Sequence, residues 1–519
     1  MPNNIRKSED QTVKDVVEVE ADTISEVSVE AEKPKTTWQM ASQYRAAIFW
    51  SSFIGLAGIN WGMDTLLSNG VIAVPSFQKD FGYLFKDQYI VSAPWQIAFN
   101  TASSIGGCFG AFASGYLADK IGKRFALGIG CFISIGAVFI QLFAGQPGTL
   151  LVGKLINGLS LGCFLAIPSS YAAEICPVEL RGLTTSAVQL FIGIGQLVAN
   201  LILKGTGTLD TAWAYKIPFA LQFVFPVLLL VGLPMCPESP WYLLRNRNPN
   251  TATSTLARLG YDNPLKTLAE MQKTITFEEQ KVDATTYLDC FRGSDLRRTE
   301  IAIGIFSVSQ LVGVVFAIGY SSYFFQLAGL SPSSSFSMSV GVSVLGLVGV
   351  VCSWFLLNQV GRRPTALGGT SILVVLLLMI GVLDVIPVRA SNLGPVYGQV
   401  ACIILFAFIY LLTIGPVGYA LFAEVSSSRL RSRTVSLGIV VQNLFGILMH
   451  IVIPLLINPD AAALGGKIGF IFGGTAFMSV VWVYFRVPET AHRTFEELDY
   501  LFAKGVSARV FKGVQVVAT

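Results

Sequence analysis

The sequence predicts an all-α membrane protein of twelve transmembrane helices, arranged as two six-helix bundles that repeat one another in parallel. Hydrophobic residues make up 53% of the 519 residues, charged residues make up only 13%, and the mean hydropathy is +0.61. A soluble domain carries nearer a quarter charged residues. Apolar runs of about 20 residues, the length of a helix that crosses a bilayer, recur along the chain. Several short motifs also occur twice in the same order, which indicates a duplicated unit.

Three motif pairs mark the repeat, and they lie at the ends of predicted helices. They are Glu174 and Arg181 with Glu424 and Arg431, GYLADKIGKR (115–124) with FLLNQVGRRP (355–364), and PESP (237–240) with PET (488–490). In the first pair, the glutamate and the arginine are seven residues apart in both copies. Parallel repeats in a membrane protein are typical of a carrier whose substrate site lies near the bilayer midplane, between the two halves.

Twelve apolar segments are expected to span the bilayer, and a long polar stretch separates the sixth from the seventh. The predicted spans are 48–70, 92–117, 124–144, 149–172, 183–204, 214–235, 300–325, 335–357, 365–387, 396–423, 434–457 and 466–486. The predicted domains are a disordered cytosolic N-terminal tail (1–45), an N-terminal bundle (46–237), a cytosolic helical linker (238–298), a C-terminal bundle (299–490) and a cytosolic C-terminal tail (491–519). No apolar run opens the chain, so no cleavable signal peptide is expected.

Charge and composition define the orientation and exclude several functions. Lysine and arginine gather in alternate loops, and the positive-inside rule then places both termini in the cytosol. A net charge of +4 is too small to indicate nucleic-acid binding. The eight cysteines are scattered and show no metal-ligand or disulfide spacing, and no catalytic triad is evident. We expect no enzyme activity, no cofactor and no metal. A monomer in the plasma membrane, in contact with lipid and a small-molecule substrate, is the expected state.

Several motifs resemble the sugar porter branch of the major facilitator superfamily, over about residues 48–503. They are GYLADKIGKR, LNQVGRRP, PESPWYLL and VPETAHRTFEELDYLF. Within that branch, WGMDTLLSN, PWQIAF and YAAEICPVELRGLTTSAVQLFIGIGQLVAN are most similar to fungal α-glucoside permeases of the maltose type. The resemblance implies the major facilitator fold and carbohydrate transport by alternating access. It also implies symport of protons with an α-glucoside such as maltose or sucrose, so the proton is the expected coupling ion.

Asp64 and Lys154 are the candidates for proton coupling. Asp64 lies inside the first predicted span, where a carboxylate is costly and is a functional candidate by default. The resemblance implies that Asp64 carries the coupled proton. Lys154 lies early in the fourth span, where many sugar–proton symporters have an arginine that pairs with this aspartate. Two readings of Lys154 stay open: it pairs with Asp64 as a point charge, or its amine reaches the membrane interface.

Charged residues at the predicted cytosolic ends form a second candidate group. The resemblance implies an ion-pair latch that holds the two halves together in the outward-facing state. Its members are Asp119, Arg124, Glu174, Arg181, Arg362, Arg363, Glu424 and Arg431. Surface charge that only fixes topology is the alternative, but it does not explain the repeated spacing of glutamate and arginine.

Sugar recognition is expected to rely on amides, which both donate and accept hydrogen bonds, and on an aromatic ring. Gln189 and Gln196 are seven residues apart and so share a helix face. The complete set of candidate substrate-binding residues is Gln189, Gln196, Gln310, Tyr320, Tyr419, Gln442 and Asn443. By resemblance, Tyr419 stands where sugar porters often have a tryptophan, and Tyr320 lies near an outer gate. The alternative role for the amides is hydrogen bonding between helices.

Two departures from the family pattern bear on the substrate. Val315 stands where an asparagine is typical, and Gly346 stands where a polar residue is common. The lost polar contacts and the added room suit a disaccharide or a less polar substrate better than a plain hexose. Two alternatives remain: a facilitative carrier of a hexose or another polyol-like metabolite, and a transporter-like sugar sensor. The short segment after residue 503 argues against the sensor, and the PESP and PET motifs argue against a multidrug exporter.

Overall fold

The computed structural model describes residue 40 and residues 42–282, 287–386, 393–425, 430–491, 493 and 495–511. Almost all of the tail predicted at 1–45 therefore lies outside the described residues. Residues 44–519 form one compact unit, and the fold below is that of this unit. Among its described residues it is almost entirely helical, and the one sheet that they form is a two-stranded hairpin.

The first half contains six long helical segments. Their bounds are α3 (Arg45–Gly70), α5 (Ala93–Ile121), α6 (Lys123–Leu142), α7 (Pro147–Ile175), α8 (Val178–Thr206) and the divided pair α9 (Trp213–Leu221) and α10 (Val224–Gly232). Between α3 and α5 lie the turn η1 (Val71–Ala73), the short helix α4 (Pro75–Phe81) and the strands β1 (Tyr83–Phe85) and β2 (Gln88–Ile90). Lys86 and Asp87 connect the strands with positive φ angles, as a tight hairpin turn requires.

The second half repeats this pattern. Its helices are α14 (Gly293–Leu311), the π turn η4 (Val315–Gly319), α15 (Ser321–Leu327), α16 (Pro332–Val360), α17 (Arg362–Val385), α18 (Gly394–Leu412), α19 (Ile414–Val425), α20 (Arg431–Ile457), the turn η5 (Gly465–Lys467) and α21 (Ile468–Arg486). Between the halves are η2 (Leu233–Met235), α11 (Pro240–Arg245), α12 (Pro249–Leu259), α13 (Pro264–Val282) and η3 (Tyr287–Phe291). After the second half comes α22 (Phe495–Ala503).

Ten helical segments among the described residues are long and apolar enough to cross a membrane. Two further segments lie in the same bundles: α5, which is 29 residues long, and the interrupted run from α14 through α15. These segments correspond to the twelve predicted spans. The helix of the seventh predicted span, α14, begins at Gly293 and so extends beyond the predicted span start at residue 300.

Part of the C-terminal segment beyond residue 490 is buried against the second bundle. Leu498, Leu501 and Phe502 of α22 are buried in the same hydrophobic core as residues of the second half. The backbone carbonyl of Ala508 also accepts a hydrogen bond of 2.8 Å from Arg363, at the start of α17. The described part of this segment is therefore packed against the second bundle.

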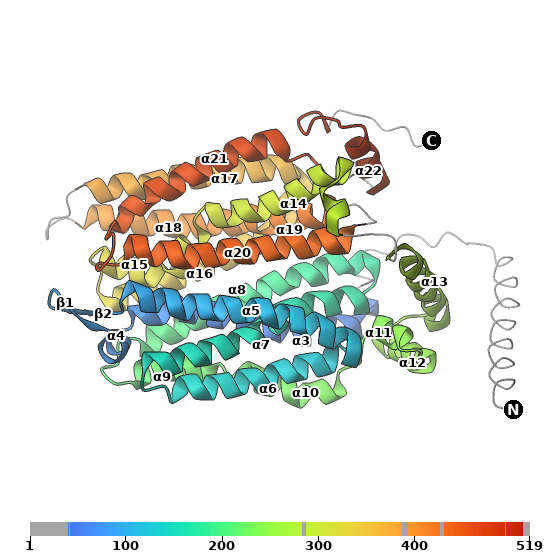
Figure 1. Cartoon of the computed structure of the whole chain (residues 1–519), viewed down its shortest axis with the longest axis horizontal. Coiled ribbons are helices and arrows are strands. Elements are labelled where there is room, and N and C mark those ends of the chain that lie inside the picture. Colours follow the sequence, from blue (N-terminus) through green and yellow to red (C-terminus); the bar gives the residue numbers. More distant parts are fainter. Residues whose placement is uncertain are drawn as a thin grey trace, which may run out of the picture. The chain divides into compact units, whose positions relative to one another are not determined.

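Helix packing within the halves follows the repeat. In the first half α5 packs against α7 and α3 packs against α8, and in the second half α16 packs against α18 and α14 packs against α20. The same correspondence relates the contacts between halves, because α5 packs against α20 and α8 packs against α16. Figure 1 shows the two bundles side by side, with the first half in blue to green and the second in yellow to red.

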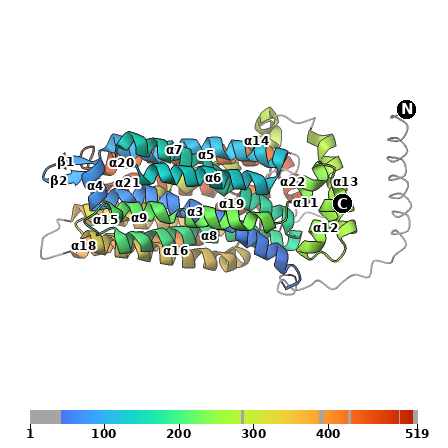
Figure 2. The same cartoon turned by 90° about the horizontal axis from the view of Figure 1, so that it is seen from below.

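The two ends of the bundles differ, and we name them by what they carry. The hairpin end carries α4, β1, β2 and α15, and the linker end carries α11, α12, α13 and α22 (Figures 1 and 2). At the hairpin end, side chains of the two halves are joined by several hydrogen bonds.

Candidate functional site

Asp64 and Lys154 meet in the interior of the first half. Asp64 lies on α3 and is fully buried, and Lys154 on α7 is only 2% exposed. The Lys154 Nζ atom is 3.4 Å from Asp64 Oδ1. Asn157, one turn further along α7, donates from Nδ2 to the same carboxylate oxygen at 2.9 Å. The pair is therefore desolvated and held by a further hydrogen bond, which is the condition under which a buried ion pair persists.

Ser68 completes this cluster and shows how α3 and α7 position it. Lys154 Nζ donates to Ser68 Oγ at 2.8 Å, and the Ser68 hydroxyl donates to Asp64 Oδ2 at 3.4 Å. Ser68 is one helical turn after Asp64, so both side chains face α7. The Lys154 amine also lies 5.2 Å from the centre of the Phe219 ring. Of the two readings left open, this geometry matches pairing, because the amine is buried beside Asp64.

The candidate sugar-binding residues of the second half lie on helices that pack together. The Tyr419 ring on α19 meets Phe306 of α14 edge-on, with centroids 5.4 Å apart. The Tyr419 hydroxyl is within hydrogen-bonding reach of Gln442 on α20. Tyr419 is 47% exposed, although it lies within a membrane-spanning helix. An aromatic ring beside an amide, both accessible, is an arrangement that binds a sugar ring and its hydroxyls.

The other amides are partly exposed and lie on different helices. Gln189 and Gln196 are half-buried on α8, and Asn443 is half-buried on α20. Gln310 is also half-buried, at the end of α14, and its buried Oε1 atom has no hydrogen-bond partner among the described residues. A buried amide oxygen without a partner costs free energy unless a ligand or water satisfies it. It is therefore a ready acceptor for a substrate hydroxyl.

Tyr320 differs from the other substrate-site candidates. Its side chain is fully buried, and its hydroxyl accepts a hydrogen bond of 2.7 Å from Asn100 Nδ2 of α5. Asn100 belongs to the first half and Tyr320 to the second, so this contact joins the halves at the hairpin end. In this structure Tyr320 is therefore part of a closed contact between the halves. Asn200 also joins the halves, since it donates to Ser343 Oγ at 2.7 Å.

The repeated PESP and PET motifs have the same structural role in both halves. Glu238 accepts hydrogen bonds from the backbone N–H groups of Lys123 and Arg124, and so caps the start of α6. Glu489 accepts from the backbone N–H groups of Arg362 and Arg363 at the start of α17. A carboxylate at a helix N-terminus is stabilised by the free N–H groups and by the helix dipole.

The geometry of these caps is the same in both halves, and it requires glycine at the start of each helix. Gly122 has φ 93° and Gly361 has φ 95°, values that side chains other than glycine rarely adopt. A Cβ atom on Gly122 would lie 2.5 Å from a carboxylate oxygen of Glu238, and one on Gly361 would lie 2.7 Å from Glu489. Burial raises the pKa of Glu238, and the backbone N–H donors oppose that shift.

The ion pairs at the linker end also come in matched copies. Glu174 of α7 pairs with Lys123 at 2.7 Å, and Glu424 of α19 pairs with Arg362 at 2.7 Å. Each glutamate also accepts a hydroxyl hydrogen bond, from Ser239 and Thr490 respectively. Each ion pair joins two residues of the same half. In this state these two pairs therefore do not form the predicted latch between the halves.

The remaining latch candidates are accounted for as follows. Arg124 donates from its guanidinium to the Cys236 carbonyl at 3.2 Å. Arg363 donates to the Tyr484 carbonyl at 2.8 Å. Asp119 is exposed and its charge acts on Lys123. The side chains of Arg181 and Arg431 lie outside the described part of the structure.

Comparison with known proteins assigns this architecture to a family. The family model described as "Sugar (and other) transporter" matches residues 50–502, which is most of the chain. The chain belongs to the sugar transporter family. Its fold agrees: the partially occluded, inward-open structure of the xylose transporter XylE from E. coli superimposes with a TM-score of 0.70 at 20% identity, covering 86% of this chain and all of that one.

Curated relatives of this sugar transporter include two kinds of yeast permease. A general alpha-glucoside permease of Saccharomyces cerevisiae is 31% identical over 498 residues, which covers 93% of this chain and 80% of the permease. A maltose permease of Saccharomyces cerevisiae is 33% identical over 499 residues, covering 94% of this chain and 80% of the permease. The transporter is thus an all-α, multi-pass membrane protein of the major facilitator fold.

Sequence reasoning missed several polar residues of the transporter. Asn157 and Ser68 contact the Asp64 and Lys154 pair, and Lys123 is the partner of Glu174. Lys123 had a usable signal, because it occupies the position that Arg362 occupies in the repeat. For Asn157 and Ser68, the only signal in the sequence was that they lie one helical turn from Lys154 and Asp64, respectively. Within the described residues, no cluster of three or more His, Cys, Asp or Glu side chains is suited to a metal.

Proposed function

We propose that this transporter imports α-glucosides such as maltose or sucrose together with protons, by alternating access across the plasma membrane. The identity of 31–33% with yeast permeases named for α-glucosides and maltose carries the substrate assignment. The buried pair of Asp64 and Lys154 carries the proton assignment. In the orientation that the positive-inside rule favours, the hairpin end faces outward and the linker end faces the cytosol.

The proposed sugar site uses residues from both halves. Gln189 contributes from the first half, and Gln310, Tyr419 and Gln442 contribute from the second. The exposed ring of Tyr419 suits stacking on a sugar ring, and the unpaired oxygen of Gln310 suits acceptance from a hydroxyl. Gln196 and Asn443, on the same helices as Gln189 and Gln442, extend the site toward a second sugar unit. A substrate that contacts both halves binds at the site about which the two halves rock during alternating access.

The proposed coupling depends on the charge of Asp64. An ionised Asp64 attracts Lys154 and accepts hydrogen bonds from Asn157 and Ser68. A proton on Asp64 removes this attraction and leaves the Lys154 amine without its counter-charge. The protonated and ionised forms therefore favour different arrangements of α3 and α7, and such a difference links proton binding to a conformational equilibrium.

The proposed latch belongs to the opposite state. With the hairpin end joined, this structure corresponds to a transporter that is closed to the outside. Glu174 and Glu424 then pair within their own halves. When the hairpin end opens, the linker ends approach each other, and the same charges become able to pair between the halves. The latch would stabilise that outward-facing state.

Facilitated diffusion is the second candidate, and the same ion pair favours it. Lys154 supplies a permanent counter-charge 3.4 Å from Asp64, so the carboxylate does not need a proton to be neutralised. A carrier of this kind would equilibrate a sugar or polyol without accumulating it. Proton-coupled accumulation and equilibration give different time courses, which makes the two functions separable by experiment.

The decisive experiment compares the wild type with Asp64→Asn in cells that lack other sugar transporters. We expect the wild type to accumulate labelled maltose, to raise the external pH on maltose addition, and to stop accumulating when a protonophore is present. Asp64→Asn keeps the size of the side chain and one acceptor oxygen but cannot carry the charge. It should retain exchange of labelled maltose while losing accumulation and the pH change.

Two outcomes would contradict the proposal in different ways. Accumulation that persists in Asp64→Asn and still collapses with the protonophore would remove Asp64 from the coupling step. Wild-type uptake that only equilibrates, with no change in external pH, would favour facilitated diffusion. Gln399→Ala, which alters a buried amide remote from Asp64, serves as the expression and folding control.

A further inference from the structure

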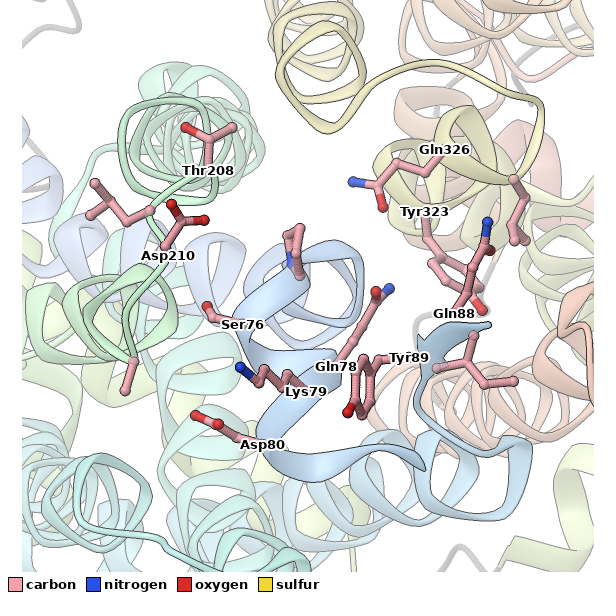
Figure 3. Close-up of a pocket in the computed structure, with 15 residues that line it drawn as sticks. Ser76, Gln78, Lys79, Asp80, Gln88, Tyr89, Thr208, Asp210, Tyr323 and Gln326 are labelled. Atoms are coloured by element: carbon pink, nitrogen blue, oxygen red, sulfur yellow. The ribbon is translucent and has the colours of Figure 1, made fainter. Parts of the chain in front are cut away.

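A polar groove of about 690 Å³ opens at the hairpin end and is separate from the site described above. Its volume falls in the range of about 300–1,000 Å³ that is typical of small-molecule sites. The lining residues come from α4, β2, the segment 208–212 and α15. Figure 3 shows Thr208 and Asp210 on one side, Gln326 and Tyr323 on the other, and Gln78 with Tyr89 between them.

The lining has the chemistry of a carbohydrate site. Three amides (Gln78, Gln88 and Gln326) lie beside hydroxyl groups and a 45%-exposed tyrosine ring, that of Tyr89. The Ser76 hydroxyl is buried beside the groove and has no hydrogen-bond partner among the described residues. Amides and hydroxyls that both donate and accept suit vicinal hydroxyls, and an exposed ring suits the apolar face of a sugar.

The charges around the groove disfavour an anionic ligand. Lys79 is accompanied by two carboxylates, Asp80 and Asp210, so the lining is net negative. Asp80 accepts a hydrogen bond of 2.8 Å from the Tyr215 hydroxyl and is thereby tied to the wall. Asp210 is exposed and remains available as an acceptor. A neutral polyhydroxyl compound fits this pattern better than a phosphate or a carboxylate.

The groove is formed by both halves of the transporter. α4, β2 and the segment 208–212 belong to the first half, and α15 belongs to the second. Gln326 of α15 donates to the Ala73 carbonyl at 2.8 Å, next to the start of α4. The groove therefore exists in this form only while the hairpin end is closed. A ligand that binds it favours the closed state by its differential affinity for that state.

We propose that this groove is a second saccharide site, which binds an α-glucoside from the outside while the outer end is closed. This inference rests on the proposed function and adds a regulatory site to it. Because the occupied groove holds the two halves together, high external sugar retains the transporter in the closed state and slows its return to the outside. Uptake is then inhibited by its own substrate at high concentration.

Uptake measurements over a wide range of maltose concentrations test the regulatory part. We expect wild-type uptake to rise, reach a maximum and then decline. Tyr89→Ala and Asp210→Asn should weaken groove binding by roughly fivefold each, the effect of losing one contact, and so move the decline to higher concentration with an unchanged KM. Leu84→Ala is the matched control, because Leu84 is 59% exposed on the same hairpin and does not line the groove.

Photoaffinity labelling locates the site directly. A maltose derivative with a diazirine, added outside intact cells, should label peptides that contain 75–90 or 208–212, and Tyr89→Ala should lose this labelling while Leu84→Ala keeps it. Wild-type uptake without a decline, or labelling confined to α8, α14, α19 and α20, would overturn the second site. Saturable uptake at low maltose tests the proposed function on its own, so a wild type that transports but lacks groove labelling contradicts the groove alone.

Discussion

Asp64 and Lys154 depend on each other because both are removed from water. Removing one member of a buried ion pair leaves an uncompensated charge and costs about 3–5 kcal/mol, whereas replacing both members is often nearly neutral. The remaining hydrogen bonds, from Asn157 to Oδ1 and from Ser68 to Oδ2, do not compensate the charge of the Asp64 carboxylate. A variant that lacks the lysine therefore measures the cost of leaving the carboxylate charge unpaired.

We predict that Lys154→Met destabilises the protein, because it leaves the buried Asp64 carboxylate without its counter-charge. The free energy of unfolding should fall by about 3–5 kcal/mol. The double variant Asp64→Asn with Lys154→Met removes both charges and should be more stable than the single variant. Thermal unfolding of the wild type and of both purified variants is the measurement, and equal Tm values for the single and the double variant would contradict the idea.

At the scale of single residues, the sequence offered candidates but did not predict how they are arranged. Asp64 and Lys154 were recognisable because charges inside a membrane span are rare. Their contact was not, since the two residues lie on different helices and Lys154 had two plausible positions. Tyr320 was assigned to the substrate site, yet it contacts Asn100 from the other half. A contact between distant parts of the chain leaves no local signal in the sequence.

The matched helix starts show what the repeated motifs do for the elements. In each half, a glycine with positive φ lets the chain turn into a helix, and a glutamate from the PESP or PET motif caps that helix. The capped helices α6 and α17 thus begin beside the carboxylates of Glu174 and Glu424. The motifs first recognised as repeats are therefore structural units that position the charges at the linker end.

We predict that Gly361→Ala destabilises the second half. The positive φ costs about 1–3 kcal/mol for a side chain other than glycine, and the new Cβ would lie 2.7 Å from Glu489 Oε2. Gly368→Ala is the control within the same helix, because a Cβ there meets nothing within 4 Å. Thermal unfolding in detergent should show a lower Tm for Gly361→Ala and an unchanged or higher one for Gly368→Ala. Equal Tm values would argue against the strained start of α17.

The elements themselves were largely predictable, and the breaks within them were not. Long apolar runs located the spans because a bilayer requires about 20 apolar residues. The seventh span reads as one continuous run, but the chain leaves the α-helix after Leu311, and Gly313 has φ 81°. The tenth span divides at Thr413, three residues before Pro416, which cannot continue a helix without losing a hydrogen bond. Of these two breaks, only the one at Thr413 had a signal in the sequence.

For the whole molecule, the repeat predicted two halves, but it did not predict which end is closed. That depends on contacts between loops and helices far apart in the chain. Asn458 is the centre of these contacts at the hairpin end. Its side chain accepts from Gln96 Nε2 at 2.9 Å and donates to the Val91 carbonyl at 3.0 Å, both in the first half. Within its own half it contacts Tyr323 and Asp460.

The contacts of Asn458 predict that Asn458→Ala shifts the transporter toward its outward-open state. The variant removes both hydrogen bonds that Asn458 makes to the first half, with Gln96 and with the Val91 carbonyl, which keep only their hydrogen bond to each other. The closed state should therefore lose about 1–3 kcal/mol. Each 1.4 kcal/mol changes the ratio of the states about tenfold.

The measurement is the rate at which an impermeant maleimide, added outside cells, labels Gln310→Cys in a cysteine-free background. Asn458→Ala should raise this rate. Gln399→Ala is the control, since Gln399 hydrogen-bonds to Asp384 and the Ile380 carbonyl within one half, and should not change the rate. Equal labelling rates in all three proteins would mean that Asn458 does not hold the outer end closed.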